Sequence, residues 1–456
     1  MISLFRDIFP YLLVLYFVIK GIKEPFFFLG IPFLMFMSES IFFEGVKIFK
    51  IPGSLSYGLM FFWLILLRFV AVFLARSDEK KDYSYMGRFN AMDFCIIGLL
   101  LISVIGAGTT LINYADVTDV IKEFIVLISL FVSYFIIKNW TSRTNPEVLV
   151  NFLFSIVVIN TLTACLYILH QGLHFGIYPD AEYSVDIVQG VAITRTFYFM
   201  PQFLPLSVAF LLIFRHKKPF VFHILLIINV LAIFISYTRS FLINAMLIFI
   251  LYFIITGLKE GRIGLVLKNI LVFGFIGILG LFVLSKFLPA NTQFFLNRFS
   301  ELKQSSATSD PNNIQFRFQM TGLIVASMDE DKKIFGMGPV TENQVSWVRD
   351  MRATTADMVW TGVIFRWGIV GLILFILLYI FSGYSALNFY LNSEGVLSDL
   401  GLLFLLYIFS QIIESFVSWT FMSGHGFATG LWYLGMLSAF SGITKNKESL
   451  VKEVIL

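Results

Sequence analysis

The stretch DFCIIGLLLISVIGAGTTLI, residues 93–112, decides the class of this protein. Asp93 is its only charged residue. An α-helix of this length spans about 30 Å, which is the thickness of the hydrocarbon layer of a bilayer. Because backbone N–H and C=O groups in lipid must pair within the segment, the stretch predicts a membrane-spanning helix.

Similar apolar runs recur along the whole chain. The 456 residues are 58% hydrophobic and 14% charged and include 54 Phe, whereas a soluble domain is about 25% charged. This composition excludes a soluble protein with a single core. We predict an all-α, polytopic membrane protein with about 12–14 transmembrane helices. The expected spans are 8–20, 25–38, 56–75, 93–112, 120–137, 148–169, 197–214, 220–237, 240–256, 265–288, 358–381, 399–421 and 425–442.

Loops rich in Lys and Arg alternate along the chain with loops that have few of them. The positively charged loops of a membrane protein face the cytoplasm. The positive loops contain Arg76–Arg88, Lys138 with Arg143, Arg215–Lys218 and Lys259–Lys268, followed by the tail Lys445–Lys452. Loop 382–398 has no Lys or Arg, so only the alternation places it in the cytoplasm. The remaining loops, including His170–Thr196, are therefore expected outside.

One external loop is far longer than the others and divides the chain. Residues 1–288 and 358–456 hold the expected spans, and residues 289–357 form the loop. Loops of roughly 70 residues are usually functional or disordered. Asp310 and Pro311 suit the start of a helix. Beyond them, apolar residues at helical spacing predict an amphipathic helix lying on the outer membrane face, before a turn at Asp329–Lys333; these residues are Phe316, Met320, Leu323 and Ile324.

Arginines are the clearest candidates for chemistry, because positive charge is normally depleted outside. The expected external arginines are Arg195, Arg239, Arg298, Arg317, Arg349 and Arg352, and Arg366 lies inside an expected span. An Arg at the centre of a membrane helix costs about 2.5–3.5 kcal/mol. Binding of a phosphate by the guanidinium fork would explain such positions. The alternative is snorkelling to lipid phosphates or pairing with a carboxylate, and a solvated loop explains Arg298 and Arg349 better.

Few other residues suggest a site. Gly336 and Gly338 in Phe335–Pro339 permit positive φ and close approach to a ligand, although a plain turn is the alternative. Trp347 and Trp360 could stack on sugars or anchor the chain at the membrane boundary. His170 and His174 have no third metal ligand nearby, and His425 lies at the mouth of the last expected span. We therefore expect no metal site.

The order of several motifs resembles the O-antigen polymerase and O-antigen ligase superfamily. Thr238-Arg239-Ser240 joins two apolar runs, Arg317 precedes the Phe335–Pro339 turn, and Asp357 is followed by Arg366–Gly371, which contains Gly368 and Gly371. The resemblance covers about 190–371. It implies a membrane glycosyltransferase of the GT-C type, in the inner membrane with its active site facing the periplasm.

The resemblance also implies a substrate and roles for residues. The donor would be a glycan on undecaprenyl pyrophosphate, without nucleotide sugar, cofactor or nucleic acid. Arg239 and Arg317 map onto the arginines that bind the pyrophosphate, and Gly336 and Gly338 onto the glycine turn. Arg195, Arg352, Arg366 and His425 are further candidates for binding the substrate. The resemblance leaves room for membrane lipid and a chain-length regulator protein as partners.

One departure separates the two branches of the superfamily. Ligases carry a histidine before the Gly-x-x-Gly pair, and this chain has Asp357-Met358 there. The change favours a polymerase, with Asp357 as general base; Glu342 and Asp350 are alternative bases, and a helix cap is the structural explanation of Asp357. The other hypotheses are a ligase that transfers polymer to lipid A core, a scaffold protein, and a flippase or transporter using Arg68, Glu123 and Glu414.

Overall fold

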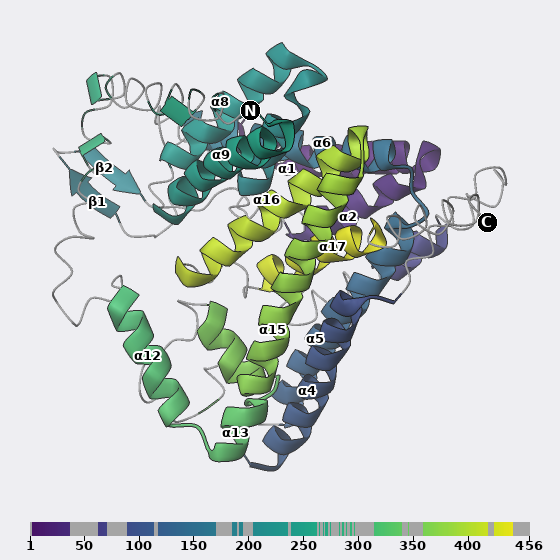
Figure 1. The fold of residues 1–456 in the computed structure, drawn as a ribbon, viewed down its shortest axis with the longest axis vertical. Coiled ribbons are helices and arrows are strands. Elements are labelled where there is room, and N and C mark those ends of the chain that lie inside the picture. The colour runs from purple at the N-terminus through teal and green to yellow at the C-terminus, as the bar shows by residue number, and fades with distance from the viewer. Residues whose placement is uncertain are drawn as a thin grey trace. The chain divides into compact units, whose positions relative to one another are not determined.

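The computed structural model describes most of the helical chain (Figure 1). The described residues are 2–36, 63–70, 89–113, 117–169, 185–188, 191–194, 204–235, 239–261, 314–339, 345, 359–417 and 424–440, with scattered positions between 264 and 296. The chain forms two compact units. The smaller unit is 1–3 with 154–316, and the larger unit is 4–153 with 317–456.

Six described helices are long and apolar enough to cross a membrane, which makes this a multi-pass membrane protein. Their mean hydropathy is 2.0 to 2.4 for five of them and 2.5 for the longest. They confirm the expected spans at 93–112, 120–137, 148–169, 240–256, 358–381 and 399–421. The expected spans 56–75 and 265–288 lie largely outside the described residues. The six are Ala91–Thr110, Val120–Thr141, Pro146–Leu166, Phe241–Glu260, Val359–Asn392 and Gly395–Phe416.

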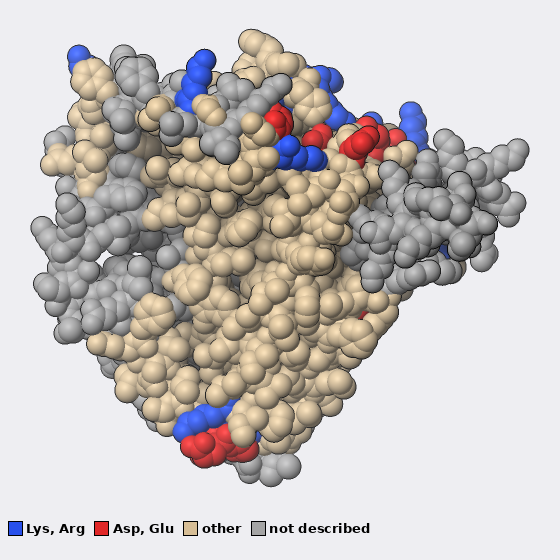
Figure 2. Space-filling model, viewed as in Figure 1, with Lys and Arg blue, Asp and Glu red and all other residues tan. Residues whose placement is uncertain are grey.

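The larger unit is built around α15 (Val359–Asn392). It packs against α4 (Ala91–Asn113) and α16 (Gly395–Val417), while α5 (Val117–Thr141) packs against α4 and α17 (Gly424–Phe440). On the face in Figure 2, a broad and largely uncharged band covers these helices, and charged residues gather at α13 (Glu330–Phe335). This distribution suits helices surrounded by lipid.

An aromatic cluster holds the N-terminal helices in the larger unit. These helices are α1 (Ile2–Lys23), the short η1 (Pro25–Leu29) and α2 (Gly30–Phe36). Phe152, from the start of α6 (Pro146–Tyr167), meets four of their rings at centroid distances of 5.2 to 6.3 Å; the four are Phe17, Phe26, Phe27 and Phe33. Aromatic packing therefore joins the chain start to the core.

The smaller unit contains the rest of α6 with α7 (Leu204–Ile213), η5 (Phe214–His216), α8 (Pro219–Ile235) and α9 (Arg239–Glu260). Amide side chains join its apolar helices. Asn160 Nδ2 donates to Ser207 Oγ at 3.0 Å, and Asn229 Nδ2 donates to Thr161 Oγ1 at 2.7 Å. Such interhelical hydrogen bonds commonly hold membrane helices together.

A β-hairpin in this unit was not expected from the sequence. Strand β1 (Val185–Val188) pairs antiparallel with β2 (Val191–Thr194), and Val188 lies opposite Val191. Both strands are rich in β-branched residues, and Gln189-Gly190 separates them in the sequence. This is a normal hairpin signal, and it lies within the expected external loop His170–Thr196.

Two expected loops prove shorter than predicted. α15 continues to Asn392 and α16 begins at Gly395, so the expected loop 382–398 reduces to Ser393 and Glu394. α5 continues to Thr141, so Lys138 belongs to a helix and not to a loop. In both cases the helix continues beyond the apolar run that marks the span.

Candidate functional site

A non-helical residue, Gly368 (φ 64°, ψ −164°), interrupts α15. We call Val359–Trp367 the half-helix. The Trp360 ring lies 6.0 Å from the ring of Phe375 and 6.5 Å from that of Tyr379. A straight helix would separate residues 360 and 379 by about 28 Å. The half-helix therefore folds back along the rest of α15, so the expected span 358–381 contains a break that the sequence analysis did not predict.

The break in α15 is completed by the Phe335–Pro339 turn. A helix break leaves backbone carbonyls without their usual partners four residues on. Here Met337 N donates to Phe365 O at 2.7 Å, and Gly338 N donates to Arg366 O at 3.0 Å. Irregular backbone is tolerated among membrane helices where protein satisfies it in this way.

Glycines allow the backbones of α4, the Phe335–Pro339 turn and α15 to meet. We call Gly106, Gly336, Gly338 and Gly368 the glycine clasp. Gly336 and Gly338 have φ of 79° and 78°, which confirms the predicted positive φ. A Cβ on Gly336 would lie 2.3 Å from the carbonyl of Arg366, and one on Gly338 would lie 2.4 Å from the carbonyl carbon of Gly106. The close approach that these glycines permit is thus to protein backbone.

Polar side chains fasten the clasp to α4. The Thr110 hydroxyl donates to the carbonyl of Met337, and Trp367 Nε1 donates to Ser103 Oγ at 2.8 Å. Lys332 Nζ donates to Thr109 Oγ1 at 2.5 Å. Burial lowers the pKa of Lys332, against the opposing influence of the carboxylates of Asp331 and Asp329.

The expected turn at Asp329–Lys333 is wrong, because Glu330–Phe335 form α13 with Asp329 as its N-cap. Glu330 and Asp331 occupy the first turn and Lys332 and Lys333 the last, so each charge suits the helix dipole. Charges that indicated a turn in the sequence instead stabilise a short helix. This helix ends at Gly336, which is its C-cap and the first glycine of the turn.

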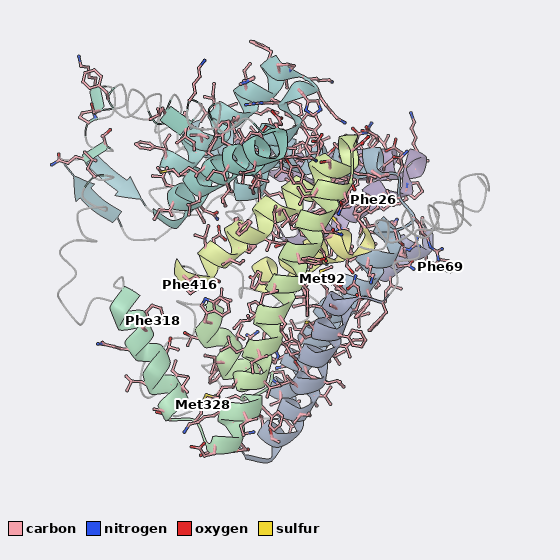
Figure 3. The ribbon with its side chains drawn as sticks, viewed as in Figure 1. Phe26, Phe69, Met92, Phe318, Met328 and Phe416 are labelled. Atoms are coloured by element: carbon pink, nitrogen blue, oxygen red, sulfur yellow. The ribbon has the colours of Figure 1, made fainter. Side chains whose placement is uncertain are left out.

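The expected loop helix is present as α12 (Ile314–Ala326). Thr321 Oγ1 lies 2.5 Å from Thr361 Oγ1 of the half-helix, and Ile324 is buried with Phe365 in one apolar cluster. Leu323, expected on the same stripe as Ile324, is 49% exposed. Phe318, on the same helix, is 53% exposed. Figure 3 shows Phe318 and Met328 towards opposite ends of this segment. α12 therefore has one apolar face against protein and a second one open.

The structure describes some of the candidate arginines. Arg317 lies on α12, one turn before Thr321. Arg366, expected inside a span, is half-buried and stands two residues before the break in α15. Arg239 is the first residue of α9, in the smaller unit.

The remaining candidates are only partly placed. His425 is the second residue of α17. Arg195, Arg352 and Asp357 lie outside the described residues, as do Glu342 and Asp350. Within the described ranges, no group of three His, Cys, Asp or Glu side chains could hold a metal ion.

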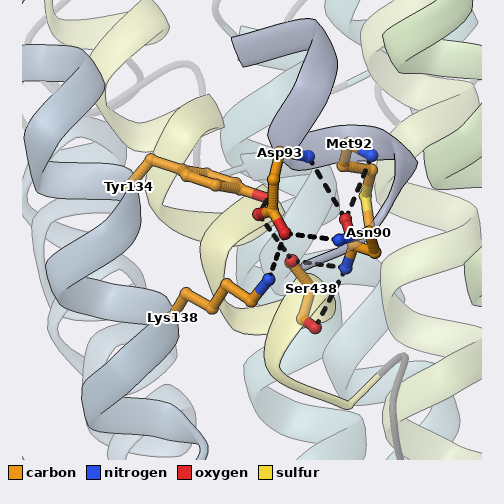
Figure 4. A network of polar contacts seen from close by, with 6 residues as sticks. All are labelled: Asn90, Met92, Asp93, Tyr134, Lys138 and Ser438. Carbon is orange, nitrogen blue, oxygen red and sulfur yellow. Dashed lines mark hydrogen bonds and ion pairs between the residues drawn. The ribbon is translucent and has the colours of Figure 1, made fainter. Parts of the chain in front are cut away.

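Charged side chains hold the opposite end of the larger unit (Figure 4). Asn90 Oδ1 accepts from the N–H groups of Met92 and Asp93, while Asp93 Oδ2 accepts from Asn90 N, which makes a reciprocal cap on α4. Asp93 also pairs with Lys138 Nζ at 2.5 Å and accepts from Tyr134 OH at 2.8 Å. Lys138, predicted to be a cytoplasmic loop charge, is thus buried in an ion pair.

Two of the residues that a transporter would use, Arg68 and Glu123, lie far apart along α5. Arg68 Nη2 donates to Asn139 Oδ1 at 3.1 Å and the guanidinium lies over Trp140, near the end of α5. Glu123 precedes Asn139 by 16 residues on the same helix, which is about 24 Å. Arg68 and Glu123 therefore lie at different depths along α5, while Glu414 lies on α16.

These features define a multi-pass membrane protein in which a long connecting segment is bound to the helix ends through α12, α13 and the glycine clasp. Residues 224–376 match the O-antigen ligase family. This part of the chain is therefore a domain of the O-antigen ligase and polymerase family, whose enzymes transfer polysaccharide in the membrane. The match includes Arg239, Arg317, the Phe335–Pro339 turn and the break at Gly368. No curated protein sequence matches the chain.

Sequence reasoning missed several residues that shape this site. Gly106 and Gly108 lie two apart in the apolar run 93–112 and look alike in sequence, but only Gly106 contacts the turn at Gly338. The sequence marks Gly368 as a motif residue but does not predict a break in the helix there, because a glycine within an apolar run is common in membrane helices. The tyrosine and amide residues on α16 carried no visible motif.

Proposed function

We propose that this protein is a polysaccharide polymerase. It transfers a growing glycan from undecaprenyl pyrophosphate to the terminal sugar of a second lipid-linked repeat. The matched domain supports the general reaction, since its family transfers polysaccharide. The observation that carries the finer assignment is Asp357, which stands where the ligase branch has a histidine.

The proposed chemistry rests on cationic stabilisation of the leaving group. The acceptor hydroxyl attacks the anomeric carbon of the donor, a new C–O bond forms, and the bond to the pyrophosphate breaks. Arg239 and Arg317 bind the departing pyrophosphate, with Arg195, Arg352 and Arg366 as supporting cations. Asp357 accepts the proton of the attacking hydroxyl. Cationic side chains thereby supply the charge that a metal ion supplies in other phosphate chemistry.

The position of α12 supports a role for Arg317. The helix that bears it is fastened to the half-helix by Thr321 and Thr361, and the half-helix is fastened in turn by the clasp. Asp357 precedes the first residue of the half-helix by two positions in the sequence. Gly336 and Gly338 then act as positioning residues, and His425 at the start of α17 is a candidate for glycan binding.

The proposed setting follows from the substrate. The lipid-linked donor requires membrane lipid, an inner-membrane location and an active site on the periplasmic side. A chain-length regulator protein is a further partner that fits a polymerase. A ligase is the second candidate, because the matched family carries that description. A flippase is disfavoured by the separation of Arg68 from Glu123 along α5.

Deletion of the gene in its native host tests the proposal through the glycans that accumulate. Surface molecules capped with a single repeat, restored to long chains by wild type but not by Arg317→Ala, are the expected result. Long polymer stranded on undecaprenyl pyrophosphate would identify a ligase instead. Single repeats trapped on the cytoplasmic side would identify a flippase. Gel electrophoresis with mass spectrometry of lipid-linked and surface glycans distinguishes the three outcomes.

A further inference from the structure

A stripe of polar residues crosses the interior of the larger unit on α16. Tyr407, Gln411 and Glu414 follow each other at spacings of four and three residues, so they share one face of the helix. They are 4%, 3% and 1% exposed. An ionisable residue inside a membrane helix is costly and usually serves a function. We call these three residues the α16 stripe.

Other polar aromatic residues surround the α16 stripe. The Tyr407 ring lies 4.6 Å from that of Tyr433 on α17. The carboxylate of Glu414 lies within electrostatic reach of the hydroxyls of Tyr379 and Tyr407. Tyr379 in turn contacts Trp360 of the half-helix, which connects the stripe to the fold-back of α15.

Two buried donors in this region have no hydrogen-bond partner among the described residues. They are Nε1 of Trp360 and Nε2 of Gln411. A buried donor without a partner costs about 1–3 kcal/mol. Such a cost suggests that the donors serve a ligand that has acceptor oxygens.

The rim of this region is aromatic and partly open. Trp360 is half-buried and its ring lies 5.4 Å from that of Phe416, which is 47% exposed. Figure 3 shows Phe416 at the end of α16. Aromatic faces beside carboxylate and amide groups suit a sugar, whose C–H face is apolar and whose hydroxyls both donate and accept hydrogen bonds.

We propose that the α16 stripe and Trp360 form a binding subsite for the uncharged sugar of the acceptor. Glu414 accepts hydrogen bonds from sugar hydroxyls, Gln411 and the Trp360 indole donate to sugar oxygens, and Trp360 with Phe416 provides the stacking surface. The subsite recognises hydroxyls and not phosphate, so it is separate from the arginines. This inference rests on the proposed function, since a glycan substrate brings the hydroxyls to the site.

Binding of a phosphate-free glycan tests the subsite. The probe is the repeat-unit oligosaccharide released from the host's own lipid-linked repeats by mild acid, titrated into the full chain in lipid nanodiscs. Wild type binds it, and Glu414→Gln weakens binding about tenfold or more through loss of hydrogen bonds to a charged group. Trp360→Phe keeps an aromatic ring but removes the indole N–H and part of the stacking surface, so it weakens binding even if Glu414→Gln does not fold.

Matched controls separate this effect from general damage. Glu394→Gln removes an exposed carboxylate between α15 and α16, and Phe409→Ala removes a 38% exposed ring on the same helix. Both keep wild-type affinity. Equal affinity of Glu414→Gln, Trp360→Phe and wild type would overturn the subsite, and so would absence of binding by wild type. If Arg317-dependent chain elongation persists in either case, the proposed function still stands.

Discussion

The two ends of the larger unit are held together by different forces. At the Asp93 end, a carboxylate joins α4 to α5 through Lys138 and Tyr134, and Ser438 of α17 donates to it at 3.5 Å. At the Gly368 end, backbone meets backbone, and glycine leaves the room for it. A charge network depends on side-chain chemistry, whereas the clasp depends on the absence of side chains. The second end is also the one that bears α12, the half-helix and the candidate site.

The largest expected effect is at the charged end. Asp93→Asn leaves the ammonium of Lys138 buried without its carboxylate, which costs about 3–5 kcal/mol. Equilibrium unfolding in mixed detergent micelles measures the change. The double variant Asp93→Leu with Lys138→Met removes both charges, and we expect it to recover most of the lost stability. A double variant as unstable as Asp93→Asn would show that the ion pair is not the source of the effect.

At the clasp, Gly368→Ala should come next in size. Its Cβ would stand 2.3 Å from the carbonyl oxygen of Ile334, and φ of 64° is strained for any other residue. Each effect costs about 1–3 kcal/mol. Gly383→Ala in the same helix meets nothing within 4 Å and is the control. Limited proteolysis around α13 measures release of the loop, and equal cleavage of the two variants would contradict the clasp.

A smaller effect distinguishes two glycines that the sequence does not distinguish. Gly106→Ala places a Cβ 2.6 Å from the Cα of Gly338, whereas Gly108→Ala meets nothing within 4 Å. Overpacking costs about 1–3 kcal/mol, and replacing a helical glycine in open space by alanine gains up to about 1 kcal/mol. The two substitutions should therefore shift the unfolding midpoint in opposite directions. A shift in the same direction would argue that the loop is not docked on α4.

The smallest expected effect is a pH dependence. Because burial lowers the pKa of Lys332, the folded protein loses this proton before the unfolded chain does. Between the lowered pKa and the ordinary value of 10.5, the unfolded chain binds more protons, so stability rises with pH in that window. Lys332→Met should abolish this rise in unfolding measured against pH, and the neighbouring Lys333→Met should keep it. A rise that persists in Lys332→Met would assign it to another group.

The sequence predicts the parts of this fold that depend on composition. The apolar runs at 93–112 and 399–421 locate helices, because their length and lack of charge have one explanation in a bilayer. The β-hairpin at Val185–Thr194 also has a local signal, the β-branched residues of its two strands, which the sequence analysis did not use. The order of Arg239, Arg317 and the glycine turn also identifies the family domain without a structure.

Tertiary contacts decide the features of the fold and of the candidate site that the sequence does not predict. Such contacts cannot be read from single residues. Nothing local shows that Lys138 pairs with Asp93, since the partner lies 45 residues away on another helix. Gly368 breaks α15 only because the Phe335–Pro339 turn supplies donors for its freed carbonyls. For the same reason Glu414 looked like a transporter residue until Tyr379 and Trp360 placed it beside the half-helix.

Chain elongation by the purified protein tests the central claim most directly. The protein is reconstituted in liposomes with lipid-linked repeats from its own host, and product length is followed by gel and mass spectrometry. Wild type and Gln319→Ala, an exposed change on α12, should build long chains on undecaprenyl pyrophosphate, and Arg317→Ala should leave single repeats. Elongation by Arg317→Ala equal to that of wild type, or no elongation by wild type, would contradict the account.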